Sequence, residues 1–129
     1  ERAACVANQF DGYEVQPGLH INGKLTLGEN IGDLGGLAIA YTALVDALKG
    51  KKIENIDGFT PEQRFFLGWA QVWAAKATPE FERRQVLTDP HSAAKWRVNG
   101  PLSNMPEFAN AFGCKQGQAM VRKDACLIW

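Results

Sequence analysis

The chain has 129 residues, 46% of them hydrophobic, and its 14 basic residues balance its 14 acidic ones. This length suits one domain with its own core, and the balanced charge offers no basic field for nucleic acid. No apolar run approaches the roughly 18 residues of a membrane span. The chain begins at Glu1 without a methionine, so we expect a processed product or a piece of a larger protein.

The first half of the chain predicts the end of one helix and then a long one. The tail of a helix is expected from Glu1 to about Asn8, followed by an aromatic turn. Pro17-Gly18 breaks the chain, and Asn22-Gly23 is a tight-turn dipeptide between short apolar pieces. The longest helix is predicted from about Leu27 to Leu48. Its apolar stripe consists of Ile31, Leu34, Ala38, Tyr41, Val45 and Leu48.

Cap-then-proline patterns predict shorter helices in the second half. Their starts are Thr60-Pro61, Thr78-Pro79 and Asp89-Pro90. An extended piece is expected around Val98 to Pro101, and a further helix near Pro106 to Phe112. No repeat or linker interrupts residues 1–129, so we predict a single compact unit of the all-α class, predominantly helical with short extended segments.

Glu29 and Asp33 form the most informative pair of side chains. Four positions apart at the start of the long helix, they project from one face. Like charges at that spacing repel by roughly 0.2–0.5 kcal/mol, so a metal, a histidine, a cation or water should compensate. Small residues continue this face and allow close approach of another helix: Gly36, Ala40, Ala43 and Ala47. A second interpretation stays open, because Thr26 and Glu29 also fit a capping box.

His91 and Arg97 are further candidates. His91 lies at a predicted helix N-terminus, where the helix dipole favours a neutral ring that donates a hydrogen bond. On a continuous helix Arg97 would lie about 240° around the axis from His91, so joint action requires a break in the helix. The extended piece after Arg97 permits one. Surface solvation or a local salt bridge is the alternative for each side chain.

The three cysteines leave at least one unpaired within the chain. A bridge between Cys5 and Cys126 would stabilise the fold by roughly 4–5 kcal/mol in the chain-entropy model. Three buried thiols in a cytosolic protein are the alternative. The sequence contains no His-Glu-x-x-His, no Cys-x-x-Cys and no Gly-rich phosphate loop.

Several blocks together resemble the neprilysin family of zinc metallopeptidases. Leu27-Gly28-Glu29-Asn30-Ile31-Gly32-Asp33-Leu34-Gly35-Gly36 is similar to that family's Leu-Gly-Glu-Asn-Ile-Ala-Asp-x-Gly-Gly block. The remaining matches run in order to the last residue: Phe65-Phe66-Leu67, Ala70-Gln71-Val72-Trp73, Asp89-x-His91-Ser92, Arg97-Val98-Asn99-Gly100, Leu102-Ser103-Asn104-Met105-Pro106-Glu107-Phe108 and Cys126-Leu127-Ile128-Trp129. Each block alone is modest, but the ordered set is highly specific.

The resemblance implies a role for each candidate residue. Glu29 matches the third protein ligand of a catalytic zinc, beside the two histidines of His-Glu-x-x-His, and Asp33 would orient one of those histidines. His91 would stabilise the oxyanion of the tetrahedral intermediate, and Arg97 would hold a substrate backbone carbonyl. Val72 and Trp73 would line the pocket for the residue after the scissile bond.

The resemblance also implies that this chain is part of a larger enzyme. His-Glu-x-x-His should lie several dozen residues before Glu29, but only 28 residues precede it. We therefore expect the carboxy-terminal part of a thermolysin-like (gluzincin) peptidase domain, with peptide substrates, completed by the remainder of the parent and inactive alone. A non-catalytic helical module that binds peptides or a partner protein is one alternative, and an unrelated helical interaction domain is another.

The family pattern also sorts the cysteines. It pairs Cys5 with Cys126 and pairs the position of Cys114 with a cysteine outside this chain. Disulfides imply an oxidising compartment, so the resemblance places the protein outside the cytoplasm: periplasmic, secreted or at the cell surface.

Overall fold

The computed structural model describes residues 1–128, so Trp129 of the terminal block lies outside the described residues. Within this range the elements follow in this order: α1 (Arg2–Asp11), β1 (Glu14–Gln16), β2 (Leu19–His20), α2 (Leu27–Leu48), α3 (Pro61–Val72), α4 (Pro79–Thr88), α5 (Ala94–Leu102) and α6 (Pro106–Phe112). The two strands pair antiparallel. The predicted helical fold class is confirmed.

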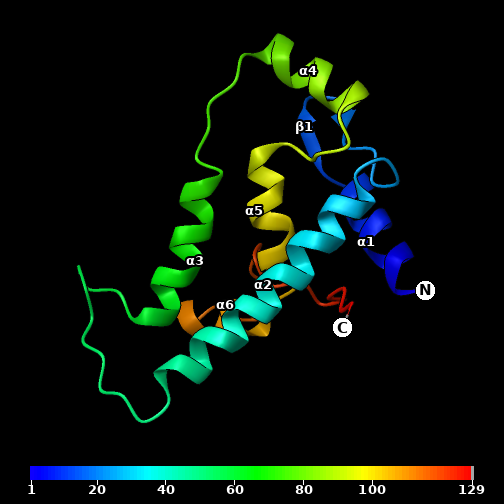
Figure 1. Ribbon diagram of the computed structural model, residues 1–129. Coiled ribbons are helices and arrows are strands. Elements are labelled where there is room, and N and C mark those ends of the chain that lie inside the picture. The colour runs from blue at the N-terminus through cyan, green and yellow to red at the C-terminus, as the bar shows by residue number, and fades with distance from the viewer. Residues whose placement is uncertain (129) are drawn as a thin grey trace.

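Helix α2 crosses the whole molecule, with α1 and α5 against it and α3 further along (Figure 1). Its predicted bounds are confirmed. The predicted apolar stripe is partly wrong, because Ala38 and Val45 are exposed whereas Leu37 is buried. Helices α1 and α5 cover the side of α2 that carries Leu34 and Leu37, so their contacts decide which apolar residues are buried.

Local cap chemistry explains where α3 and α4 begin. Thr60 forms a complete capping box with Gln63, and the Thr78 side chain accepts a hydrogen bond from the Phe81 amide. Each helix has proline in its first turn, as predicted. Helix α6 also covers the predicted range.

The prediction of a helix start at Asp89-Pro90 is wrong. A turn occupies residues 89–93, and Asp89 Oδ1 accepts the His91 amide proton over 2.9 Å instead of capping a helix. The prediction of an extended piece at 98–101 is also wrong, because these residues belong to α5. Proline is tolerated there because the carbonyl it leaves without a helical partner, that of Arg97, accepts the Trp69 indole N–H over 3.2 Å.

The segment before α2 differs from its prediction in two ways. Helix α1 continues to Asp11, past the expected end near Asn8. The turn between the two strands lies at Pro17-Gly18, where Gly18 has φ 75°, whereas Asn22-Gly23 begins a turn that leads into α2. At Gly23 a Cβ atom would lie 2.0 Å from the Ala7 carbonyl oxygen, so glycine there permits contact with α1.

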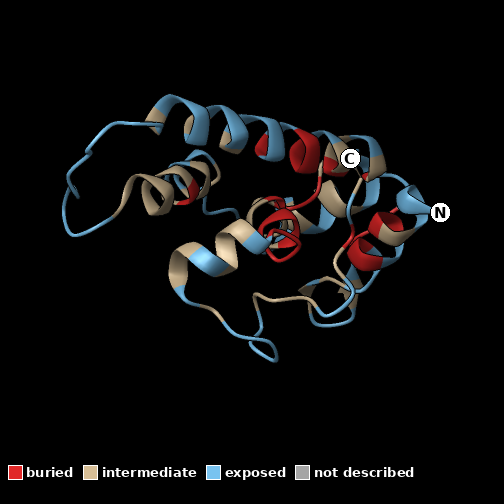
Figure 2. Cartoon of the chain, turned by 90° about the horizontal axis from the view of Figure 1, so that it is seen from below, coloured by how far each residue is buried: buried red, intermediate tan, exposed pale blue. Residues whose placement is uncertain are grey.

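Two hydrophobic clusters lie on either side of α5. The first joins α1, α2 and the C-terminal segment through Val6, Phe10, Ile21, Leu34 and Cys126. The second joins α2, α3 and α5 through Leu37, Phe66, Leu102 and Met105. Figure 2 shows the buried residues gathered where α1, α2 and α5 meet. At Gly100 a Cβ atom would lie 2.5 Å from the ring of Phe10, so this glycine allows α1 and α5 to touch.

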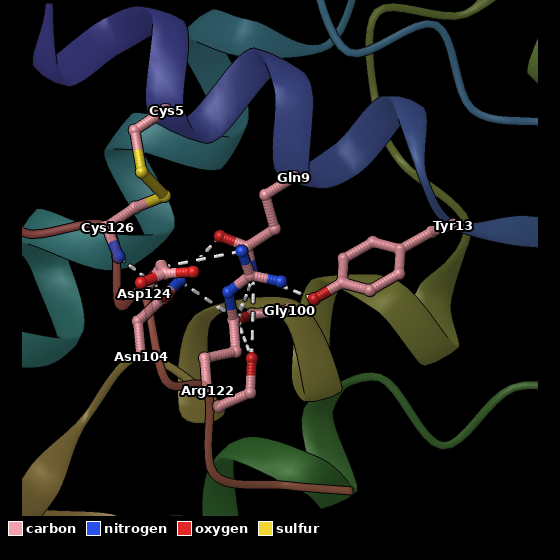
Figure 3. Close-up of a disulfide and its surroundings, with 9 residues drawn as sticks. Cys5, Gln9, Tyr13, Gly100, Asn104, Arg122, Asp124 and Cys126 are labelled. Carbon is pink, nitrogen blue, oxygen red and sulfur yellow. Dashed lines mark hydrogen bonds between the residues drawn. A yellow bond between two sulfur atoms is a disulfide. The ribbon is translucent and has the colours of Figure 1, made fainter.

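The structure contains the Cys5–Cys126 disulfide that the resemblance implied, and Cys114 is free among the described residues. Beside the disulfide, Asn104 accepts the Cys126 amide proton over 2.8 Å and donates to Gln9 Oε1, also over 2.8 Å (Figure 3). The C-terminal segment is thereby held to α1 and to the residues that follow α5.

The sequence analysis expected no segment with the length and apolar character of a membrane-spanning helix, and helix α2 tests this expectation. By length and composition alone it is apolar enough to cross a membrane, with a mean hydropathy of 1.4 over an 18-residue window. That expectation was too strict by this measure. Core helices pass the same test, and the first half of α2 is packed against α1 and α5.

Candidate functional site

The crossing of α2 and α5 brings together four of the predicted site residues. Glu29 and Asp33 lie on the first turns of α2, Arg97 lies on the first turn of α5, and His91 lies in the turn just before it. The break between His91 and Arg97 that joint action requires is present and lies just before α5, although residues 98–101, expected to be extended, are helical. Since no helix begins at His91, the helix-dipole argument for a neutral ring does not apply.

Asp33 and Arg97 form the buried floor of the site. Arg97 Nε donates to Asp33 Oδ2 over 2.7 Å and Nη2 donates to Oδ1 over 2.6 Å, a bidentate pair. Their side chains are only 7% and 8% exposed. Burial lowers the pKa of Arg97, but the hydrogen bonds and charges of Asp33 and Glu29 outweigh it and raise that pKa above its ordinary value. The guanidinium is thus a fixed cation.

Two tryptophans also contact Arg97: Trp69, which lies in α3, and Trp73, which directly follows α3. The Trp73 ring lies against the guanidinium, with Arg97 Cζ 4.1 Å from its centroid. Trp69 donates its indole N–H to the Arg97 carbonyl. No hydrogen bond in the described part of the chain uses Arg97 Nη1, so one nitrogen of the fork keeps its donors for a ligand.

Glu29 and His91 form an upper, half-exposed level, each with 44% of its side chain exposed. His91 Nε2 lies 3.4 Å from Glu29 Oε2, which also accepts from Arg97 Nη2 over 3.2 Å. The other ring nitrogen, Nδ1, lies 2.6 Å from Asp89 Oδ1. The hydrogen bonds that Asp89 accepts from the His91 amide and ring lower the pKa of its carboxyl group.

The capping-box interpretation of Glu29 is wrong. Thr26 is the N-cap of α2, but its side chain makes no capping hydrogen bond. It instead donates to the Asn22 carbonyl over 3.1 Å and accepts from Asn30 Nδ2 over 2.9 Å. The Glu29 carboxylate therefore has no role in closing its own helix end. The repulsion expected between Glu29 and Asp33 is compensated within this chain by the Arg97 guanidinium.

Val72 and Trp73 line different cavities. Val72 borders one of about 310 Å³ beside the site floor, lined mostly by apolar or small residues: Gly32, Asp33, Gly36, Leu37, Ala40, Phe65, Trp69 and Val72. Trp73 borders another of about 480 Å³, which lies between α4 and α5 and also touches His91 and Arg97. The Trp73 indole nitrogen is buried without a hydrogen-bond partner in residues 1–128.

The described residues contain no group of three or more His, Cys, Asp or Glu side chains placed to hold a metal ion. Of the site carboxylates, Asp33 is buried and engaged by Arg97 through both oxygens, whereas Glu29 is half exposed and engaged through Oε2 alone. A carboxylate oxygen such as Glu29 Oε1 suits a zinc ion as one donor of a larger set. The remaining protein donors would have to come from outside these residues.

Sequence reasoning missed three contacts of the site. Asp89 was taken as a helix cap, although the Asp-Pro-His order also suits an Asx-type turn. Trp69 was not among the candidate site residues, although its indole donates to the Arg97 carbonyl. Asn30 and Ser92 were not singled out, yet the Ser92 hydroxyl donates to Asn30 Oδ1 over 2.8 Å. Their positions directly after Glu29 and His91 were the available signal.

Comparison with known families and sequences shows the family of the chain. Residues 1–128 match the model of peptidase family M13, and the chain belongs to that family. It is 42% identical to endothelin-converting enzyme 1 of Rattus norvegicus over 132 aligned residues and 41% identical to neprilysin-3 of Drosophila melanogaster over 133. Both alignments cover 100% of this chain and 17% of the relative. The chain thus spans about a sixth of the length of these relatives.

Solved structures give the same result for the fold. The Mycobacterium tuberculosis zinc metalloprotease Zmp1, in complex with an inhibitor, matches with a TM-score of 0.93 and 38% identity, covering 99% of this chain and 21% of that one. PepO of Lactobacillus rhamnosis matches with a TM-score of 0.77 and 31% identity over 95% of this chain and 18% of its own. The recognised family and the partial coverage of its members are therefore both established.

Proposed function

We propose that this chain is the carboxy-terminal part of the catalytic domain of a zinc metallopeptidase that hydrolyses peptide bonds and that it is inactive alone. The observation that carries the proposal is the convergence of Glu29, Asp33, His91 and Arg97, which come from two separate segments. A non-catalytic binding module has no need of a buried bidentate pair beneath a half-exposed carboxylate and imidazole.

In this proposal Glu29 supplies one zinc ligand, and the other protein ligands come from outside the chain. The metal, when bound, would polarise the substrate carbonyl and activate water. Asp33 fixes the Arg97 fork, and each of its oxygens keeps a lone pair with which it can orient a neighbouring histidine. Arg97 Nη1, which makes no hydrogen bond within residues 1–128, donates to a substrate backbone carbonyl.

His91 is proposed to stabilise the oxyanion. With Nδ1 held by Asp89, the ring directs Nε2 toward Glu29, where the reacting carbonyl would lie. Val72 and Trp73 are proposed to contribute to the pocket for the residue after the scissile bond, one from each of the two cavities. The Cys5–Cys126 disulfide supports an extracytoplasmic location.

The test is Glu29→Ala in the full-length protein. We expect loss of bound zinc, measured by elemental analysis, and loss of cleavage of a fluorogenic peptide. Glu54→Ala is the matched control, because Glu54 is an exposed glutamate far from the site in the sequence and should keep both properties. Retention of zinc and of turnover in Glu29→Ala contradicts the ligand assignment. A wild-type protein that binds peptides without zinc and without cleaving them would favour the binding module.

A further inference from the structure

We propose that the buried hydrogen bond between Asn30 and Ser92 sets the spacing between Glu29 and His91, which makes Asn30 and Ser92 positioning residues. Each directly follows one of these two half-exposed groups in the sequence. The Ser92 hydroxyl donates to Asn30 Oδ1 over 2.8 Å, and the two residues are 2% and 0% exposed. The inference rests on the proposed function, because it assigns a task within the same site.

A relay of hydrogen bonds fixes the direction of this contact. The Thr26 hydroxyl proton is donated to the Asn22 carbonyl, so the Thr26 oxygen is left to accept from Asn30 Nδ2. With its nitrogen held there, the Asn30 amide must turn its oxygen toward Ser92. The Ser92 hydroxyl can then only donate in this bond. Thr26 itself is 3% exposed, so water does not compete along the relay.

The other side-chain contacts of the 89–93 turn do not fix its position relative to α2. The contact between His91 and Glu29 joins two half-exposed groups at 3.4 Å, and such pairs contribute little. The Asp89 side chain bonds only to His91, within the turn. Among residues 1–128 the Ser92–Asn30 bond is the buried polar link from this turn to α2. Without it, the main chain at His91 is free to shift relative to Glu29.

The first test is Ser92→Ala in the full-length protein. We expect kcat for peptide cleavage to fall about 10- to 100-fold, because small displacements of an oriented group are costly. KM should stay within about twofold, and bound zinc should be unchanged because Glu29 is intact. Independently of activity, amide hydrogen exchange should accelerate in residues 89–93.

Ser103→Ala is the matched control. Ser103 is also buried, 7% exposed, and its hydroxyl donates to the Gly100 carbonyl over 2.8 Å at the C-terminal end of α5, whereas the site lies at its N-terminal end. This variant loses the same chemical group and should have a similar drop in melting temperature, with kcat and exchange in 89–93 unchanged. An equal loss of kcat in both variants overturns the inference, because the effect would then be one of general stability.

A double-variant comparison sharpens the assignment. If one bond carries the effect, Asn30→Leu combined with Ser92→Ala lowers kcat no further than the stronger single variant. Multiplied losses, or unchanged exchange of residues 89–93 in Ser92→Ala, overturn the inference. A further outcome separates the two proposals. If the wild-type protein neither binds zinc nor cleaves peptides, but Ser92→Ala still accelerates hydrogen exchange in residues 89–93, the spacing role is supported and the proposed function is refuted.

Discussion

The two halves of α2 bury different kinds of side chain. The first half buries two polar residues, Asn30 and Asp33, beside the apolar Leu34 and Leu37. In the second half, residues 38–48, no residue reaches full burial, and Ile39 is 71% exposed (Figure 2). One continuous helix thus exposes apolar groups at one end and buries polar ones at the other.

The difference teaches that partners, rather than hydropathy, decide burial along this helix. Asp33 is buried because Arg97 supplies two donors to it, and Asn30 is buried because Thr26 and Ser92 satisfy its amide. Ile39 is exposed because none of α1, α3 and α5 covers its side of α2 in the described residues. The polar half is therefore where substitutions should have large consequences.

The largest effect is expected for Asp33→Ala. It leaves the buried Arg97 guanidinium without its bidentate partner, so the free energy of unfolding should fall by about 3–5 kcal/mol. Chemical denaturation of the chain, followed by circular dichroism, measures this.

The double variant Asp33→Leu with Arg97→Met is the control for that prediction. Replacing both charges by apolar groups removes the unpaired cation, so it should recover much of the loss. A single variant as stable as the wild type would mean that Glu29 and Trp73 suffice to hold Arg97.

The helices could be predicted wherever their ends are set by local chemistry. The Thr60 and Thr78 caps, each followed by proline, depend on neighbours within four positions, and both predictions were confirmed. The error at 89–93 is local, because Asp89 accepts the His91 amide proton in an Asx-type turn. The error at 98–101 has a tertiary cause. The carbonyl freed by Pro101 is satisfied by Trp69 of another helix, and no local pattern contains that information.

The sequence predicted which residues form the site, but not which of them contact one another. Glu29, Asp33, His91 and Arg97 were found through their spacing and through resemblance to a family. Their pairings depend on how α2 and α5 cross, since Arg97 lies 64 positions from Asp33 and Ser92 lies 62 from Asn30. Resemblance to a family indicates which residues carry the chemistry, but it does not show which side chains bond to each other.

A smaller effect is expected from acid, at the turn that faces the polar half of α2. The folded pKa of Asp89 lies below its ordinary value of 3.8, mainly because the carboxylate accepts the His91 amide proton. The sign follows from linkage: the turn is stabilised above the unfolded pKa and loses that stability as pH falls through the folded one. The protection of residues 89–93 against hydrogen exchange, expressed relative to the intrinsic exchange rate at each pH, should fall in the wild type from about pH 5 down to pH 2.

Asp89→Asn is the matched control for the acid experiment. Its amide keeps an acceptor oxygen and cannot titrate, so the difference in exchange between wild type and variant should vanish at the acid end of the range. A constant difference across the range would mean that Asp89 shapes the turn without its charge. The effect is smaller than that of Asp33 because 42% of the Asp89 side chain is exposed and water screens it.

The smallest effect is expected for Ile39→Ser in the exposed half of α2. Because 71% of Ile39 is already in contact with solvent, the free energy of unfolding of the chain should change by no more than about 0.5 kcal/mol. Leu37→Ala, two positions earlier on the same helix and 4% exposed, should cost about 2–5 kcal/mol under the same denaturation conditions. Equal losses in the two variants would mean that Ile39 is buried in solution, and the contrast between the halves of α2 would then fail. Unequal losses would place the boundary between them within two residues of Leu37, where the cover of neighbouring helices ends.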